Sequence, residues 1–128
     1  MLNKSFTIKI NNKIKSFKKT IKVDSDKSIS IRSFIISSVS QNISAVKNVL
    51  ESDDVFSCVN CLRKLGVKIE KIRPKEYKIY GKGLGSLNIS KNKTLNCGNS
   101  GTAARLIVGL LLTSPSLFLI PEVFSHSA

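Results

Sequence analysis

The residues of this sequence that are best suited to chemistry are those that bind anions, and they fall in two short segments. In the first, Lys27, Ser28 and Arg32 stand at the expected start of a helix. Backbone N–H groups there have no partner within the helix, and the lysine, hydroxyl and arginine add donors for a phosphate or carboxylate. Lysine and serine at a helix start are more often solvated capping residues, so this segment alone does not establish a site.

The second segment, residues 97–102 (CGNSGT), is a turn with two glycines that leads into a very apolar helix. Glycines let the backbone approach a ligand closely, and the helix dipole favours an anion at that point. Arg105 lies one turn into the helix, where its charge must be paired or must reach solvent. The residues alone fit an anion site and, equally, a tight packing turn whose arginine extends to solvent.

The cysteines and the histidine give weaker signals. Cys58 and Cys61 form a CxxC motif, but they fall in the middle of a predicted helix on its apolar side. A redox or zinc site would use a helix start or a loop with further ligands nearby. Cys97 is an isolated third thiol and His126 is the only histidine, so we predict no zinc site and no Ser/His/Asp triad. We interpret the three cysteines as inert.

Alternating and helical patterns of apolar residues indicate the elements that must position these segments. Phe6, Ile8 and Ile10 alternate as in a strand, whereas Ser52 caps a helix that Asp53 and Asp54 open with favourable charge. Helices are predicted at residues 28–40, 52–66 and 101–112, and strands within residues 1–22 and at 46–50, 67–72, 77–80 and 87–89. This order predicts an α/β or α+β layered fold. The apolar residues 116–128 should dock as a further strand or meet a partner surface.

Composition limits the class of protein. Apolar residues make up 41% of the chain, which is enough for one compact domain, and 21 Lys and Arg against 8 Asp and Glu give a net charge of +13. The apolar run at residues 106–112 is too short to span a bilayer, and no secretory signal follows Met1. We therefore expect a cytoplasmic protein without a membrane partner.

The strong positive charge leaves a small nucleic-acid-binding domain as the alternative function. Aromatic residues make up only 6% of the chain, tryptophan is absent, and the lysines are spread over strands instead of one helix face. Base stacking and groove recognition therefore lack an obvious platform.

Four segments, taken in order and spacing, resemble the N-terminal quarter to third of the 5-enolpyruvylshikimate-3-phosphate synthase family. They are residues 26–32 (DKSISIR), 51–55 (ESDDV), 65–67 (LGV) and 98–105 (GNSGTAAR). The sibling UDP-N-acetylglucosamine enolpyruvyl transferases share the fold but lack the glycine turn and have Asn where this chain has Ser28. Ser28 and residues 98–105 therefore favour the shikimate enzyme family.

The resemblance implies an enolpyruvyl transferase fold of two domains built from βαβαββ units, an inverse α/β barrel. Residues 1–22 would then be strands of the other, discontinuous domain, and residues 23–128 would be an incomplete transferase domain. The implied reaction transfers the carboxyvinyl group of phosphoenolpyruvate to shikimate 3-phosphate and releases phosphate, in the biosynthesis of aromatic amino acids. It needs neither a metal nor an organic cofactor.

The resemblance also implies roles for single residues. Lys27 would contact both substrates, Ser28 and Arg32 would bind shikimate 3-phosphate, Asn99 and Gly101 would contact phosphoenolpyruvate, and Arg105 would support the turn. The implied partners are these anionic small molecules, without nucleic acid or membrane, and the full-length enzyme would be a monomer. Family members are much longer, and their catalytic acid and base would lie beyond Ala128. We therefore expect this chain to be a fragment that is inactive alone.

Overall fold

The computed structural model describes residues 24–89, 94–114 and 124–125, together with residues 7, 9 and 11. The strands predicted within residues 1–22 lie almost wholly outside the described residues. In chain order the elements are α1 (Lys27–Val39), β1 (Ile43–Lys47), α2 (Asp53–Lys64), β2 (Lys68–Arg73), β3 (Glu76–Tyr80), β4 (Leu95–Asn96), α3 (Gly101–Leu111) and β5 (Phe124–Ser125). The mixture of helices and antiparallel strands confirms the predicted fold class.

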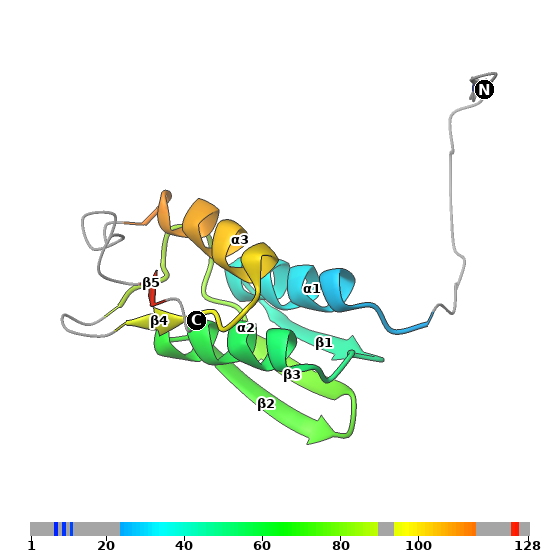
Figure 1. The fold of residues 1–128 in the computed structure, drawn as a ribbon, viewed down its shortest axis with the longest axis horizontal. Helices are drawn as coiled ribbons and strands as arrows, with labels where there is room; N and C mark the ends of the chain where they lie inside the picture. The colour runs from blue at the N-terminus through cyan, green and yellow to red at the C-terminus, as the bar shows by residue number, and fades with distance from the viewer. Residues whose placement is uncertain are drawn as a thin grey trace.

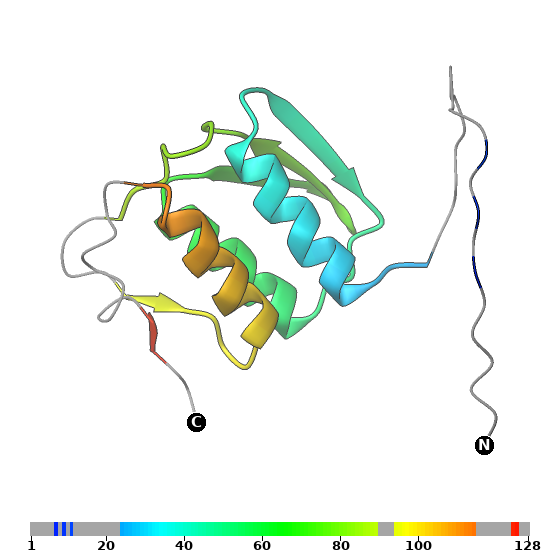
Figure 2. The ribbon, with the colours of Figure 1, turned by 90° about the horizontal axis from the view of Figure 1, so that it is seen from above.

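The main sheet has the strand order β1-β3-β2, with both pairs antiparallel. α1 and α2 pack against this sheet, and α3 packs against both of those helices (Figures 1 and 2). Ile79, in the central strand β3, is fully buried and stands opposite Ser44 of β1 and Ile69 of β2. The core therefore lies between the sheet and the helices and continues under α3.

Local sequence explains where α1 begins and where α2 begins and ends. The carboxylate of Asp26 caps α1 by accepting from the N–H of Ile29 at 2.8 Å, so the helix starts one residue before the predicted Ser28. Asp53 and Asp54 place negative charge at the start of α2 as predicted. Gly66, at φ +92°, provides the left-handed backbone that ends this helix.

Two predictions about the later part of the chain were incomplete or wrong. Residues 87–89 do not form a strand, although Leu87 and Ile89 are buried, because this segment has no strand partner among the described residues. β4 was not predicted, because its two residues are too few to show a periodic pattern. It pairs in parallel with β5, so residues 124–125 dock as a short strand, while the rest of residues 116–128 lies outside the described part.

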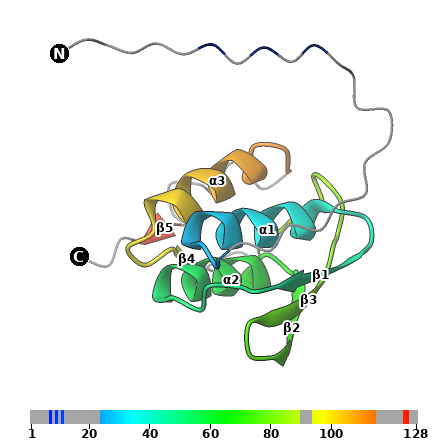
Figure 3. The ribbon, with the colours of Figure 1, turned by 90° about the vertical axis from the view of Figure 1, so that its right-hand side faces the viewer.

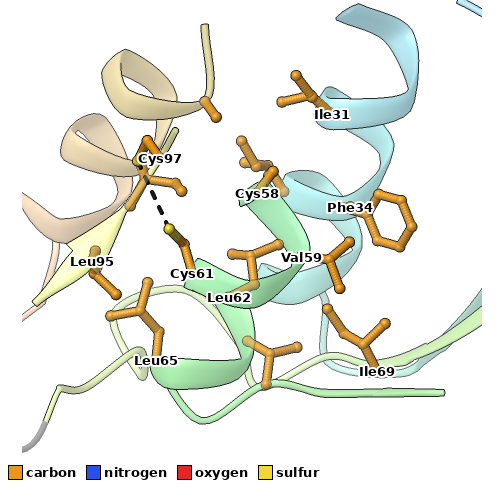
Figure 4. Close-up of a cluster of buried hydrophobic side chains, with 14 of the residues drawn as sticks. Ile31, Phe34, Cys58, Val59, Cys61, Leu62, Leu65, Ile69, Leu95 and Cys97 are labelled. Atoms are coloured by element: carbon orange, nitrogen blue, oxygen red, sulfur yellow. Dashed lines mark hydrogen bonds between the residues drawn. The ribbon is translucent and has the colours of Figure 1, made fainter. Parts of the chain in front are cut away.

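Two further observations concern apolar α3 and the cysteines. Within the described residues, none of the helices combines the length and the hydropathy needed to cross a bilayer. Cys58, Cys61 and Cys97 are buried free thiols, and for Cys58 and Cys61 the apolar spacing predicted this burial. Cys97 is not isolated, however: its sulfur lies 3.8 Å from that of Cys61 (Figure 4). The sequence prediction was wrong here because it had no means of placing α2 beside residues 95–97.

Candidate functional site

The starts of α1, α2 and α3 lie at the same end of the molecule. The three helices run in the same direction, and the end at which they begin is the right-hand side of Figure 1 and the left-hand side of Figure 3. An ion pair between Lys27 and Asp54 joins the first turns of α1 and α2. The turn before α3 also approaches α2, because a Cβ at Gly98 would stand only 2.7 Å from the hydroxyl of Ser57. The two predicted anion segments are therefore brought to one end.

The α1 start presents two cations to solvent. Lys27 Nζ lies 2.8 Å from Asp54 Oδ2, and this hydrogen-bonded carboxylate raises the pKa of the lysine above its usual 10.5. The lysine side chain remains 48% exposed in spite of the pair. Ser28 is half-buried, and Arg32, one turn further on, is exposed and forms no ion pair with any described residue. An anion would therefore meet the charge of Arg32 and would compete with Asp54 for Lys27.

Packing fixes the position of α1 under these side chains. Ile31 and Phe34 are fully buried, and the Phe34 ring meets the Tyr77 ring edge-on with centroids 5.2 Å apart. The hydroxyl of Ser30 donates to the carbonyl of Asp26 at 2.6 Å and accepts from the N–H of Leu50 at 3.0 Å. The first turn of α1 is therefore tied to the loop that leads into α2.

The glycine turn is held by a different set of bonds. Gly98, at φ +57°, donates its N–H to Asn96 Oδ1 at 2.8 Å, and Ser100 caps α3 by accepting from the N–H of Ala103 at 3.1 Å. Gly101 is exposed, and a Cβ there would have no atom of the described residues within 4 Å. The two glycines therefore differ: Gly98 is required by the fold, whereas Gly101 leaves the start of α3 open to a ligand.

The remaining predicted residues of this segment, Asn99 and Arg105, point to solvent. Both are exposed. Arg105 makes no ion pair with any residue the structure describes, so its charge reaches water, as one of the two sequence interpretations required. The predicted role of Arg105 in supporting the turn is not accompanied by a hydrogen bond to the turn within the described part of the chain. That role stays a prediction.

Sequence reasoning missed the role of Asp54 at this end. The residue was interpreted only as negative charge at the start of α2, and a local pattern cannot show that it would meet a lysine 27 positions earlier. The packing of α1 against α2 creates this contact. At this end the described residues thus bring together three helix starts, the cations Lys27 and Arg32, and the carboxylates of Asp26, Asp53 and Asp54. The helix starts and the two cations are suited to binding and orienting a small anion.

Comparison with known proteins identifies the family. The family model for EPSP synthase (3-phosphoshikimate 1-carboxyvinyltransferase) matches residues 11–121. The chain belongs to the EPSP synthase family. This confirms the resemblance that the four sequence segments indicated, and it does not favour the alternative of a nucleic-acid-binding domain.

Individual EPSP synthases agree with this assignment. The 3-phosphoshikimate 1-carboxyvinyltransferase of Syntrophomonas wolfei is 42% identical over 112 residues, which are 88% of this chain and 26% of the relative. That of Magnetococcus marinus is 42% identical over 96 residues, 75% of this chain and 21% of the relative. A solved EPSP synthase from Acinetobacter baumannii matches with a TM-score of 0.63 at 34% identity, over 75% of this chain and 22% of that one. The chain spans about a quarter of the length of its curated relatives.

Proposed function

We propose that this chain provides one wall of the substrate cleft in the 3-phosphoshikimate 1-carboxyvinyltransferase reaction. The reaction adds a hydroxyl of shikimate 3-phosphate to the enol carbon of phosphoenolpyruvate and then eliminates phosphate. In this proposal residues 23–128 are part of one transferase domain, and residues 1–22 contribute strands to the other. The observation that carries the proposal is that the starts of α1 and α3, with Lys27 and Gly101 exposed, lie at one end of the molecule.

Each assigned residue contributes binding or orientation. Lys27 binds both substrates, Ser28 and Arg32 bind shikimate 3-phosphate, and Asn99 and Gly101 contact phosphoenolpyruvate. Charged and backbone donors fixed in advance stabilise the negative charge of the substrates and hold the reacting atoms together. We assign no proton transfer to these residues, so we expect the 128-residue chain to bind without turnover.

Binding of shikimate 3-phosphate, followed by NMR amide shifts, tests the proposal. We expect shifts at residues 26–32 and 98–102, and we expect Lys27→Ala to abolish them. Lys68→Ala is the matched control, because Lys68 also pairs with a carboxylate, Glu70, at 2.9 Å, but stands at the start of β2, after the end of α2. The proposal is wrong if a saturating concentration of shikimate 3-phosphate leaves the amide shifts of both segments unchanged. It is also wrong if Lys68→Ala weakens binding as much as Lys27→Ala.

The same protein variants, tested for binding to generic DNA, distinguish the proposed function from the alternative of a nucleic-acid-binding domain. Binding to generic DNA would weaken steeply with salt and would depend on both lysines to a similar degree. Salt-dependent DNA binding without any response to shikimate 3-phosphate would replace the proposed function.

A further inference from the structure

The buried thiols of Cys61 and Cys97 face each other across the contact between α2 and the segment before α3. Their sulfur atoms lie 3.8 Å apart, and the residues are 1% and 4% exposed (Figure 4). We propose that Cys61 and Cys97 form a redox modification site, at which a small peroxide converts the two thiols into a reversible disulfide. The proposal does not depend on the proposed function.

The geometry requires only a short movement. A disulfide bond is about 2.05 Å long, so the sulfurs must approach by about 1.8 Å. Cys97 is followed by Gly98, and it is preceded by the two-residue strand β4, so the backbone on its side is not part of a long rigid element. Rotation of the two side chains and a small shift of this segment can close the gap.

A pocket gives the pair access to solvent. It has a volume of about 440 Å³, far larger than a peroxide molecule needs. Its lining consists of Ser57, Asn60, Cys61, Arg63, Lys64, Asn96 and Gly98. Cys61 itself and both neighbours of Cys97 in the sequence therefore border the pocket. Cys97 is not part of this lining, so in our proposal the oxidant enters beside Cys61 and meets Cys97 after the side-chain rotation that brings the two sulfurs together.

The environment distinguishes the pair from the third cysteine. Cys61 carries one proton and has two acceptors in reach, the carbonyl of Asn96 at 3.2 Å and the sulfur of Cys97. Once Cys97 ionises, its thiolate is the stronger acceptor, and this hydrogen bond lowers the pKa of Cys97 and raises that of Cys61. Burial raises the pKa of Cys58 to about 12, so Cys58 stays a thiol. Within the described residues the thiols are not part of a group that could hold a metal ion.

The chemistry balances with hydrogen peroxide as the oxidant. The Cys97 thiolate attacks one peroxide oxygen, the O–O bond breaks, and hydroxide leaves, which produces a sulfenic acid. The Cys61 thiol gives its proton to the hydroxide, and its sulfur attacks the sulfenic sulfur. The S–O bond breaks, and its oxygen leaves as water after taking up one proton from solvent. In total the two thiols lose two electrons and two protons, and the peroxide becomes two molecules of water.

The disulfide would fasten the glycine turn to α2. Cys97 lies three residues before Ser100, the cap of α3, and Cys61 lies in the last half of α2. The cross-link therefore restricts the backbone between β4 and α3, and we expect slower amide hydrogen exchange at residues 98–101 in the oxidised protein.

Peptide mapping of the peroxide-treated 128-residue chain tests the proposal. Trypsin leaves Cys58 and Cys61 together in residues 48–63 and places Cys97 in residues 94–105. The Cys58→Ser variant therefore makes the assignment unambiguous, because in it a cross-link between these two peptides joins Cys61 to Cys97. We expect this cross-linked species to weigh about 2 Da less than the two peptides together and to disappear with dithiothreitol.

Two variants complete the design. Cys97→Ser should abolish the cross-link, and Cys61→Ser should leave a sulfenic acid at Cys97 that a dimedone probe labels. The mapping on the Cys58→Ser and unchanged chains remains decisive if either variant fails to fold. The proposal is overturned if peroxide leaves all three thiols intact, if the cross-link joins Cys58 to Cys97, or if the pair reacts only in urea.

Discussion

The start of α1 and the start of α3 stand at the same end of the molecule but are built from different interactions. Ionised groups hold the first: the Asp26 carboxylate caps α1, and Lys27 pairs with Asp54. Neutral groups hold the second, through the hydroxyl of Ser100 and the side-chain amide of Asn96. An incoming anion therefore has to compete with carboxylates at α1, whereas at α3 it meets an uncharged turn.

The difference indicates that two kinds of perturbation act separately on the two helix starts. Backbone and hydroxyl changes should affect the α3 start, while changes of charge and pH should affect the α1 and α2 starts. Glu51 adds to the charged interactions near the start of α2. It forms an ion pair with Lys71 and accepts hydrogen bonds from the hydroxyl of Tyr77 and the N–H of Lys75.

The largest effect is expected from Gly98→Ala. The residue has φ +57°, and its new Cβ would stand 2.7 Å from the Ser57 hydroxyl, so the free energy of unfolding should fall by about 1–3 kcal/mol. Gly101→Ala is the control: no atom in the described part of the chain would lie within 4 Å of the new Cβ, and helical alanine should change stability by less than about 1 kcal/mol. Urea unfolding measures both. Equal losses in the two variants would contradict the assigned division between a structural and an open glycine.

The next effect contrasts two serine caps. Ser100→Ala removes the acceptor of the Ala103 N–H and should cost about 1–2 kcal/mol. Ser52 caps α2 without a side-chain hydrogen bond, and its buried hydroxyl oxygen has no hydrogen-bond partner among the residues that the structure describes. Ser52→Ala should therefore leave stability within about 0.5 kcal/mol of the parent or raise it. Thermal unfolding of the two variants measures this difference, and a larger loss of stability in Ser52→Ala than in Ser100→Ala would contradict the assigned roles of the two serines.

Lowering the pH should weaken the charged interactions of Glu51 near the start of α2. The Lys71 ammonium, followed by the Tyr77 hydroxyl, lowers the pKa of Glu51 from 4.5 to about 2. A carboxylate with a lowered folded pKa stabilises the protein above its unfolded value, so this contribution is lost as the pH falls from about 4.5 towards 2. Glu51→Gln should remove that part of the acid dependence. Urea midpoints from pH 7 to 3 measure it, and identical pH profiles would refute the assignment.

The smallest expected effect is that of Asp54→Asn on stability, because exposed ion pairs contribute little. The substitution should have a larger effect on binding: Lys27 loses its competing carboxylate, so phosphate dianions should bind roughly fivefold more tightly at low salt. Asp53→Asn is the neighbouring control. A fall in affinity would mean that Asp54 positions Lys27 instead of competing for it.

Patterns along the chain were enough to predict the three helices and the paired strands β2 and β3, whereas the strand predicted at residues 46–50 lies at Ile43–Lys47. Asp53, Asp54 and Gly66 mark the ends of α2, and the spacing of apolar residues identified its buried side. The family and the two anion segments followed from short motifs of fixed spacing. These signals are local, because capping, glycine turns and helical periodicity each involve residues within a few positions of one another.

The contacts that local patterns could not predict join distant segments. Lys27 meets Asp54, and Cys61 meets Cys97, because α1 and the segment before α3 pack on opposite parts of α2. The two-residue strand β4 forms only because residues 124–125 lie beside it. None of these three contacts has a sequence signature, since each depends on how whole elements pack.

Since α1, α2 and α3 all point the same way, each adds about half a positive charge to one shared end. Three such partial charges held close together repel one another. Asp26, Asp53 and Asp54 therefore act as resident counterions that allow the helices to lie side by side. A dianion bound at this end would act as a further counterion for the three helix starts. Its binding should therefore stabilise the folded protein, and only the folded protein should bind it.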